Sequence, residues 1–169
     1  MFKEQLQQIM VQHRDYNKIH LVGYSMGGLV IRSFLACNDI PQLGRCVLIA
    51  TPNQGTKLAD ISEKYLKPLV LIVRPLQVLT TNCLNIGQPM NQSKIEIGVI
   101  AGNKNNHPLG VFLTPDSDGL VEVESTKYTD MSDFIIVPYG HLEIHRQTAT
   151  AQLVHRFLQT GSFRNLNNE

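Results

Sequence analysis

The segment best suited to chemistry is residues 23–28, Gly-Tyr-Ser-Met-Gly-Gly, which places a serine inside a glycine-rich turn. An apolar run precedes it and apolar residues at helical spacing follow it. A strand-to-helix turn this tight strains its middle residue and projects the side chain upward, so Ser25 is a candidate nucleophile. Because neighbouring backbone passes close to the turn, we expect the positions of Gly23 and Gly27 to need small residues. The Met26 N–H, at the positive end of the helix, is placed to stabilise an oxyanion.

A serine hydroxyl becomes nucleophilic when a base takes its proton, and the base needs an acid to orient it. In strand-turn-helix hydrolases the acid comes next along the chain and the histidine last. Asp116 and Asp118 follow a third predicted strand, and His141 follows a fourth. The order Ser25, Asp118, His141 therefore fits such a site. Asp116 stays open as an alternative acid, although an aspartate here can also cap a turn.

Two further residues have alternative interpretations. His145 lies four residues after His141, so the pair could face one way on a helix and bind a metal. The segment His-Leu-Glu-Ile-His matches neither order of the zinc-protease helices and suggests no third ligand, which favours a polar helix-face residue. Tyr24 is either a substrate-binding residue of an acyl pocket or a residue that packs over the turn.

The elements that must position these residues alternate between helix and strand. Continuous apolar runs predict strands at residues 19–22, 46–50, 95–101 and 134–137. Helical spacing or composition predicts helices at residues 2–13, 29–36, 57–66 and 148–159, the last ending at a C-cap glycine, Gly161. Such a sequence predicts an α/β fold with a parallel sheet covered on both faces and function at the carboxyl ends of its strands. Residues 67–90, interrupted by prolines, are a candidate lid or cap.

Composition limits the function classes. The 169 residues predict a single domain, and a net charge of +1 argues against a nucleic-acid partner. The longest apolar run, residues 68–73, is far shorter than the roughly 20 residues of a transmembrane helix. The amino terminus lacks a signal-peptide core, and the three cysteines form neither a disulfide framework nor a metal site. We therefore expect a cytoplasmic protein.

The sequence resembles the α/β-hydrolase-fold serine esterases and lipases, in particular the bacterial lipase-like group. The resemblance covers most of residues 19–157 and rests on four segments: residues 23–30, residues 50–55 (Ala-Thr-Pro-Asn-Gln-Gly), residues 118–125, which begin Asp-Gly, and the late His141. It implies that Ser25 is the nucleophile, Asp118 the acid and His141 the base. It also implies a small-molecule or lipid-like ester as substrate, with no metal or organic cofactor.

The sequence departs from the family pattern at its beginning. Only eighteen residues precede the first predicted strand, and the His-Gly dipeptide of the family's second oxyanion donor does not occur. The chain therefore resembles the carboxyl-terminal portion of a larger hydrolase that lacks the amino-terminal strands. An unpaired strand edge and uncovered apolar faces predict a homo-oligomer, and a missing donor predicts weak activity. An acyltransferase using the same triad and a non-catalytic remnant or interaction module are the alternative functions.

Overall fold

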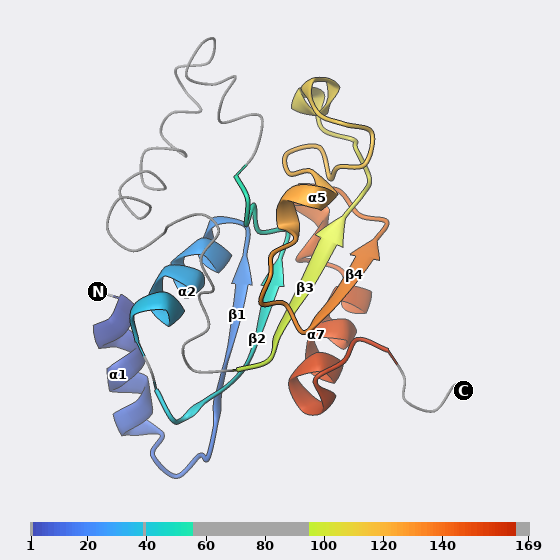
Figure 1. Cartoon of the computed structure of the whole chain (residues 1–169). Helices are drawn as coiled ribbons and strands as arrows, with labels where there is room; N and C mark the ends of the chain where they lie inside the picture. The colour runs from blue at the N-terminus through green and yellow to red at the C-terminus, as the bar shows by residue number, and fades with distance from the viewer. Residues whose placement is uncertain (1, 39, 56–94, 165–169) are drawn as a thin grey trace.

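The four continuous apolar runs form one parallel sheet in the computed structural model, which describes residues 2–38, 40–55 and 95–164 (Figure 1). Its strands are β1 (Ile19–Tyr24), β2 (Leu43–Ile49), β3 (Ile97–Gly102) and β4 (Asp133–Val137). They lie side by side in chain order, and each neighbouring pair is parallel. The predicted α/β sheet is therefore confirmed.

Three longer helices accompany the strands. They are α1 (Phe2–Gln12), α2 (Met26–Cys37) and α7 (Thr148–Thr160). Gly161 ends α7 with φ 81° and donates its N–H to the Phe157 carbonyl, which confirms the predicted C-cap. The predicted helix at 57–66 and the candidate lid at 67–90 lie outside the described residues.

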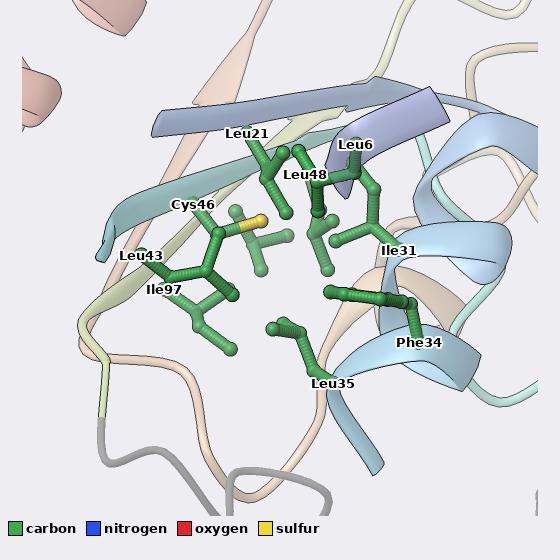
Figure 2. Packing of buried hydrophobic residues seen from close by; sticks show 10 residues of the cluster. Leu6, Leu21, Ile31, Phe34, Leu35, Leu43, Cys46, Leu48 and Ile97 are labelled. Atoms are coloured by element: carbon green, nitrogen blue, oxygen red, sulfur yellow. The ribbon is translucent and has the colours of Figure 1, made fainter. Parts of the chain in front are cut away.

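β3 and the second half of β2 are apolar and buried because both faces of the sheet are covered there. Along β2, Cys46 and Leu48 belong to one buried cluster, whereas Val47 and Ile49 belong to the other. The first cluster lies between the sheet and the helices α1 and α2, and in Figure 2 Leu6, Ile31, Phe34 and Leu35 surround Leu48. Successive residues of β2 thus point into two different apolar cores. For this reason the strand does not alternate between apolar and polar residues, as a strand with one exposed face would.

The second cluster covers the opposite face. Phe157 of α7 and Phe163, just after that helix, are fully buried against Val47, Ile49 and Ile100. The two rings pack with centroids 4.8 Å apart. The carboxyl-terminal helix and the residues that follow it therefore anchor β2 and β3, and β3 leads into one of the loops of the site described below.

Three short helices were not predicted from the sequence. They are η1 (Pro108–Phe112), α5 (Val123–Thr126) and α6 (His141–Ile144). Each has at most five residues, too few to display a helical period of apolar positions. All three follow the carboxyl ends of β3 or β4, where they shape the site-bearing loops (Figure 1).

β1 is an edge strand within the described sheet, since it pairs there with β2 alone. Its side chains His20 and Val22 are exposed, and Val22 is 48% accessible. An exposed edge of this kind was the reason for expecting a homo-oligomer, which stays a prediction. None of the helices in the described ranges is long and apolar enough to cross a membrane.

Candidate active site

Ser25 is the single residue between β1 and α2. Its backbone has φ 51° and ψ −122°, a conformation that non-glycine residues rarely adopt. Its N–H still donates to the Ile49 carbonyl at 2.8 Å, so the turn begins from a strand that is paired to its last residue. The strained turn predicted for this serine is confirmed, at a backbone cost of roughly 1–3 kcal/mol that the surrounding structure must offset.

Two glycines let the chain close this turn, but only one of them was identified from the sequence. A Cβ on Gly23 would lie 2.6 Å from the Gly28 Cα, so Gly23 has the predicted steric role. The same role was expected of Gly27 and is wrong for the described part of the chain, where no atom lies within 4 Å of a Cβ built there. The crowded position is Gly28, whose added Cβ would collide with the buried side chain of Thr51.

Alanine substitutions should separate the two helical glycines of the turn. Gly28→Ala is expected to destabilise the fold by about 1–3 kcal/mol, because Thr51 is fully buried and has no room to move. Gly27→Ala is the matched control, and should be neutral or stabilising by about 0.5–1 kcal/mol because alanine favours the helix. Urea unfolding of the two variants measures the difference. Equal losses of stability would contradict the assignment of the crowding to Gly28.

His141 lies within hydrogen-bond distance of both predicted partners. It is the first residue of α6, four residues beyond the end of β4. Its Nε2 is 3.0 Å from the Ser25 Oγ, and its Nδ1 is 2.7 Å from the Asp118 Oδ2. The histidine is only 6% exposed and the aspartate 1%. The structure thus brings together three residues that the sequence separates by up to 116 positions.

The Asp118 carboxylate is held in one orientation by its own loop. Its Oδ1 accepts the backbone N–H of Leu120 at 3.0 Å and that of Val121 at 2.7 Å. The intervening Gly119 has φ 92°, a left-handed conformation that lets the chain turn back on the carboxylate. With Oδ1 occupied in this way, Oδ2 faces the imidazole of His141.

The alternative acid does not face this site. Asp116 is exposed, and its backbone carbonyl accepts the N–H of Val123 at 3.0 Å. Asp118, two residues later, is buried against His141. Of the two aspartates that the sequence left open, Asp118 is therefore the one that faces His141, and its role as the acid stays a prediction.

Comparison with known proteins identifies the fold. No protein-family model matches the chain, and no curated protein matches it. The mature form of the lipase BlEst2 from Bacillus licheniformis gives a TM-score of 0.67 at 18% identity, over 92% of this chain and 69% of that one. Its propeptide form gives 0.69 at 21% identity, over 98% and 40%. The esterase PF2001 from Pyrococcus furiosus gives 0.57 at 18% identity, over 91% and 57%.

The chain has the α/β-hydrolase fold. The likeness extends over at least 91% of the chain. The chain itself spans 69% of mature BlEst2 and less than two thirds of the other two chains. The predicted resemblance to the esterases and lipases of this fold is thus confirmed at the level of architecture.

Within this α/β-hydrolase fold, the Tyr24 side chain contacts both His141 and His145. The Tyr24 hydroxyl donates to the His141 backbone carbonyl at 2.7 Å. Its ring centroid is 5.3 Å from that of His141 and 4.3 Å from that of His145. His145 is exposed, as expected for a polar helix-face residue. Among the described residues no group of three or more histidine, cysteine or acidic side chains could hold a metal ion.

Met26 begins α2, immediately after Ser25. Its backbone N–H therefore lies at the amino terminus of a twelve-residue helix, where partial positive charge favours an anion. The chain contains no His-Gly dipeptide, the feature from which a second oxyanion donor was expected. The role of Met26 as an oxyanion donor stays a prediction.

Arg32 is a structural residue of this region that sequence reasoning missed. It is 6% exposed, and its Nη1 donates to the backbone carbonyl and the Oδ1 of Asn53, at 2.7 and 2.9 Å. Asn53 in turn donates to the Thr126 carbonyl of α5 at 2.5 Å. Burial lowers the pKa of Arg32 to about 10. The signal was a lone cation on the otherwise apolar helix α2, and its effect is to join α2 to the loops after β2 and β3.

Proposed function

We propose that this protein hydrolyses carboxylic esters through an acyl-enzyme on Ser25. The observation that carries the proposal is the hydrogen-bonded series from the Asp118 carboxylate through the His141 imidazole to the Ser25 hydroxyl. Each member has a chemical task in such a series: the acid orients the base, and the base removes the proton of the nucleophile. The serine lies on a strained strand-to-helix turn, the backbone conformation that a nucleophile of this kind adopts.

The proposed reaction has two halves. The Ser25 Oγ attacks the carbonyl carbon while the His141 Nε2 accepts its proton, and the Met26 N–H receives the developing oxyanion. Collapse of the tetrahedral intermediate breaks the bond to the alcohol, which leaves with the proton held by His141. Water then attacks the acyl-enzyme with His141 again as base, which releases the acid and restores Ser25. Asp118 holds the imidazole in the tautomer that presents Nε2 to the serine.

The substrate class rests on two supports. The structural neighbours carry the names lipase and esterase. In addition, large apolar side chains are exposed on segments that follow β3 and β4, where Val111 is 79%, Phe112 54% and Leu142 58% accessible. Leu142 comes directly after the proposed base. We therefore favour an ester with an apolar acyl chain over a charged one.

A panel of p-nitrophenyl esters of graded acyl length tests this function. We expect saturable hydrolysis, faster for an apolar medium-length acyl group than for acetate. If Met26 is the sole oxyanion donor, turnover should lie about 10²–10³-fold below the roughly 10 s⁻¹ of a typical enzyme. The Ser25→Ala variant is the matched control for background hydrolysis.

Three outcomes of this panel would change the proposal. Hydrolysis that equals the Ser25→Ala background for every ester would indicate a non-catalytic remnant. Acyl transfer to an added alcohol that exceeds hydrolysis would indicate an acyltransferase using the same residues. Turnover near 10 s⁻¹ would mean that another backbone N–H completes the oxyanion site.

A further inference from the structure

His141 is held through its main chain as well as through its ring. Its backbone N–H donates to the Asp118 carbonyl at 2.9 Å, and its backbone carbonyl accepts the Tyr24 hydroxyl at 2.7 Å. The ring nitrogens bond to the Asp118 carboxylate and to Ser25. Four hydrogen bonds therefore join this one residue to two segments, the Asp118 loop on one side and the Tyr24–Ser25 dipeptide on the other.

We propose that Tyr24 is a positioning residue, whose hydroxyl fixes the distance and angle between the His141 imidazole and the Ser25 oxygen. The proposal rests on the proposed function, because it assigns to His141 the task of deprotonating Ser25. Tyr24 directly precedes the nucleophile and is itself held in the sheet, opposite Ile49 of β2. Its phenol therefore links the base to the same short stretch of backbone that carries the nucleophile.

The segment that carries His141 needs such a link. It is the helix α6, which has only four residues, whereas an isolated helix of fewer than about 12 residues is marginal in water. The N–H of His145, at the end of α6, donates to the Glu143 carbonyl. The Tyr24 phenol supplies a hydrogen bond to the His141 carbonyl from outside the helix. The other contacts of α6 are the N–H groups of Glu143 and Ile144 on the Gly140 carbonyl and the buried side chain of Ile144, and none of these acts on the His141 carbonyl.

The surroundings of Tyr24 keep its phenol protonated, so that it stays a hydrogen-bond donor. The side chain is half-buried, and its ring lies against both His141 and His145. Burial and then the nearby Asp118 carboxylate raise the pKa of Tyr24, while Arg146 acts in the opposite direction. The phenol therefore keeps its proton at neutral pH. Since this proton is already donated to a main-chain carbonyl, it is not available to a polar group of a substrate.

The test is Tyr24→Phe, which removes the hydroxyl and keeps the ring. We expect kcat for a p-nitrophenyl ester to fall by about 10–100-fold, because a small misplacement of a catalytic group has effects of that size. KM should change by less than about threefold, since substrate binding is untouched. The rate of Ser25 labelling by a fluorophosphonate should fall by the same factor as kcat. Tyr16→Phe, an exposed tyrosine on the loop after α1, is the matched control and should leave all three values unchanged.

A spectroscopic measurement separates this proposal from the proposed function. The His141 Nδ1 proton, shared with Asp118, is expected to give a downfield NMR signal that broadens or shifts in Tyr24→Phe and not in Tyr16→Phe. If the unmodified protein proves inactive, the proposed function fails, and the same signal still decides whether Tyr24 positions His141. An unchanged signal with unchanged kcat and labelling would overturn the proposal. A rise in KM alone would instead make Tyr24 a substrate-binding residue.

Discussion

Replacing Ser25 by alanine is expected to lower ester hydrolysis by about 10⁴-fold or more and to abolish labelling by a fluorophosphonate probe. The reason is geometric. Ser25 lies on the strained turn at the end of β1, and its Oγ is 3.0 Å from the His141 Nε2. A hydroxyl without such a base nearby does not react at a useful rate. Mass spectrometry of the labelled protein should find the probe on Ser25 alone.

Ser117→Ala is a suitable control for this substitution. Ser117 is fully buried beside Asp118, and within the described residues its hydroxyl has no hydrogen-bond partner. Its replacement removes a serine close to the site without removing an interaction of the triad, so labelling and turnover should persist. Labelling that survives in Ser25→Ala and maps to another serine would refute Ser25 as the nucleophile.

Asp118→Asn and His141→Ala are expected to reduce hydrolysis by about 10⁴-fold each, the size typical of losing one triad member. In Asp118→Asn the amide oxygen can still accept the N–H groups of Leu120 and Val121, so the loop should keep its shape. The amide nitrogen, however, presents hydrogens to the His141 Nδ1 and favours the wrong tautomer. The imidazole then no longer offers an unprotonated Nε2 to Ser25.

Each of these changes has a matched control in the same segment. Asp116→Asn alters an exposed aspartate two residues away, and His145→Ala alters an exposed histidine at the other end of α6. Both should retain most of the activity, although His145→Ala also removes a ring that packs on Tyr24. Steady-state kinetics with a p-nitrophenyl ester compare the four variants. A larger loss in either control than in its partner would mean that the wrong member of that pair has been assigned.

The sequence determined the four strands, the longer helices of the described residues and the chain order of the proposed catalytic residues. Strands covered on both faces have no polar alternation, so β3 and the second half of β2 were visible as continuous apolar segments. β1 and β4 were visible as short apolar runs, although part of each is exposed. The strained turn was visible because few sequence patterns allow a helix to begin one residue after a strand. The glycine-rich pattern around Ser25 is one of these patterns. The steric limits of a tight turn and the apolar runs of buried strands are properties of adjacent residues. Both can therefore be detected in a single sequence.

The tertiary structure decided which atoms meet. Asp116 and Asp118 lie in one loop, and only the way this loop folds back turns Asp118 towards His141. The crowding at Gly28 comes from Thr51, at the end of another strand, and so could not be found within the turn itself. The partner of the Tyr24 hydroxyl lies 117 residues away along the chain. Such contacts depend on the register and packing of strands that are distant in the sequence. The residue types of the two partners alone therefore do not predict that they will meet.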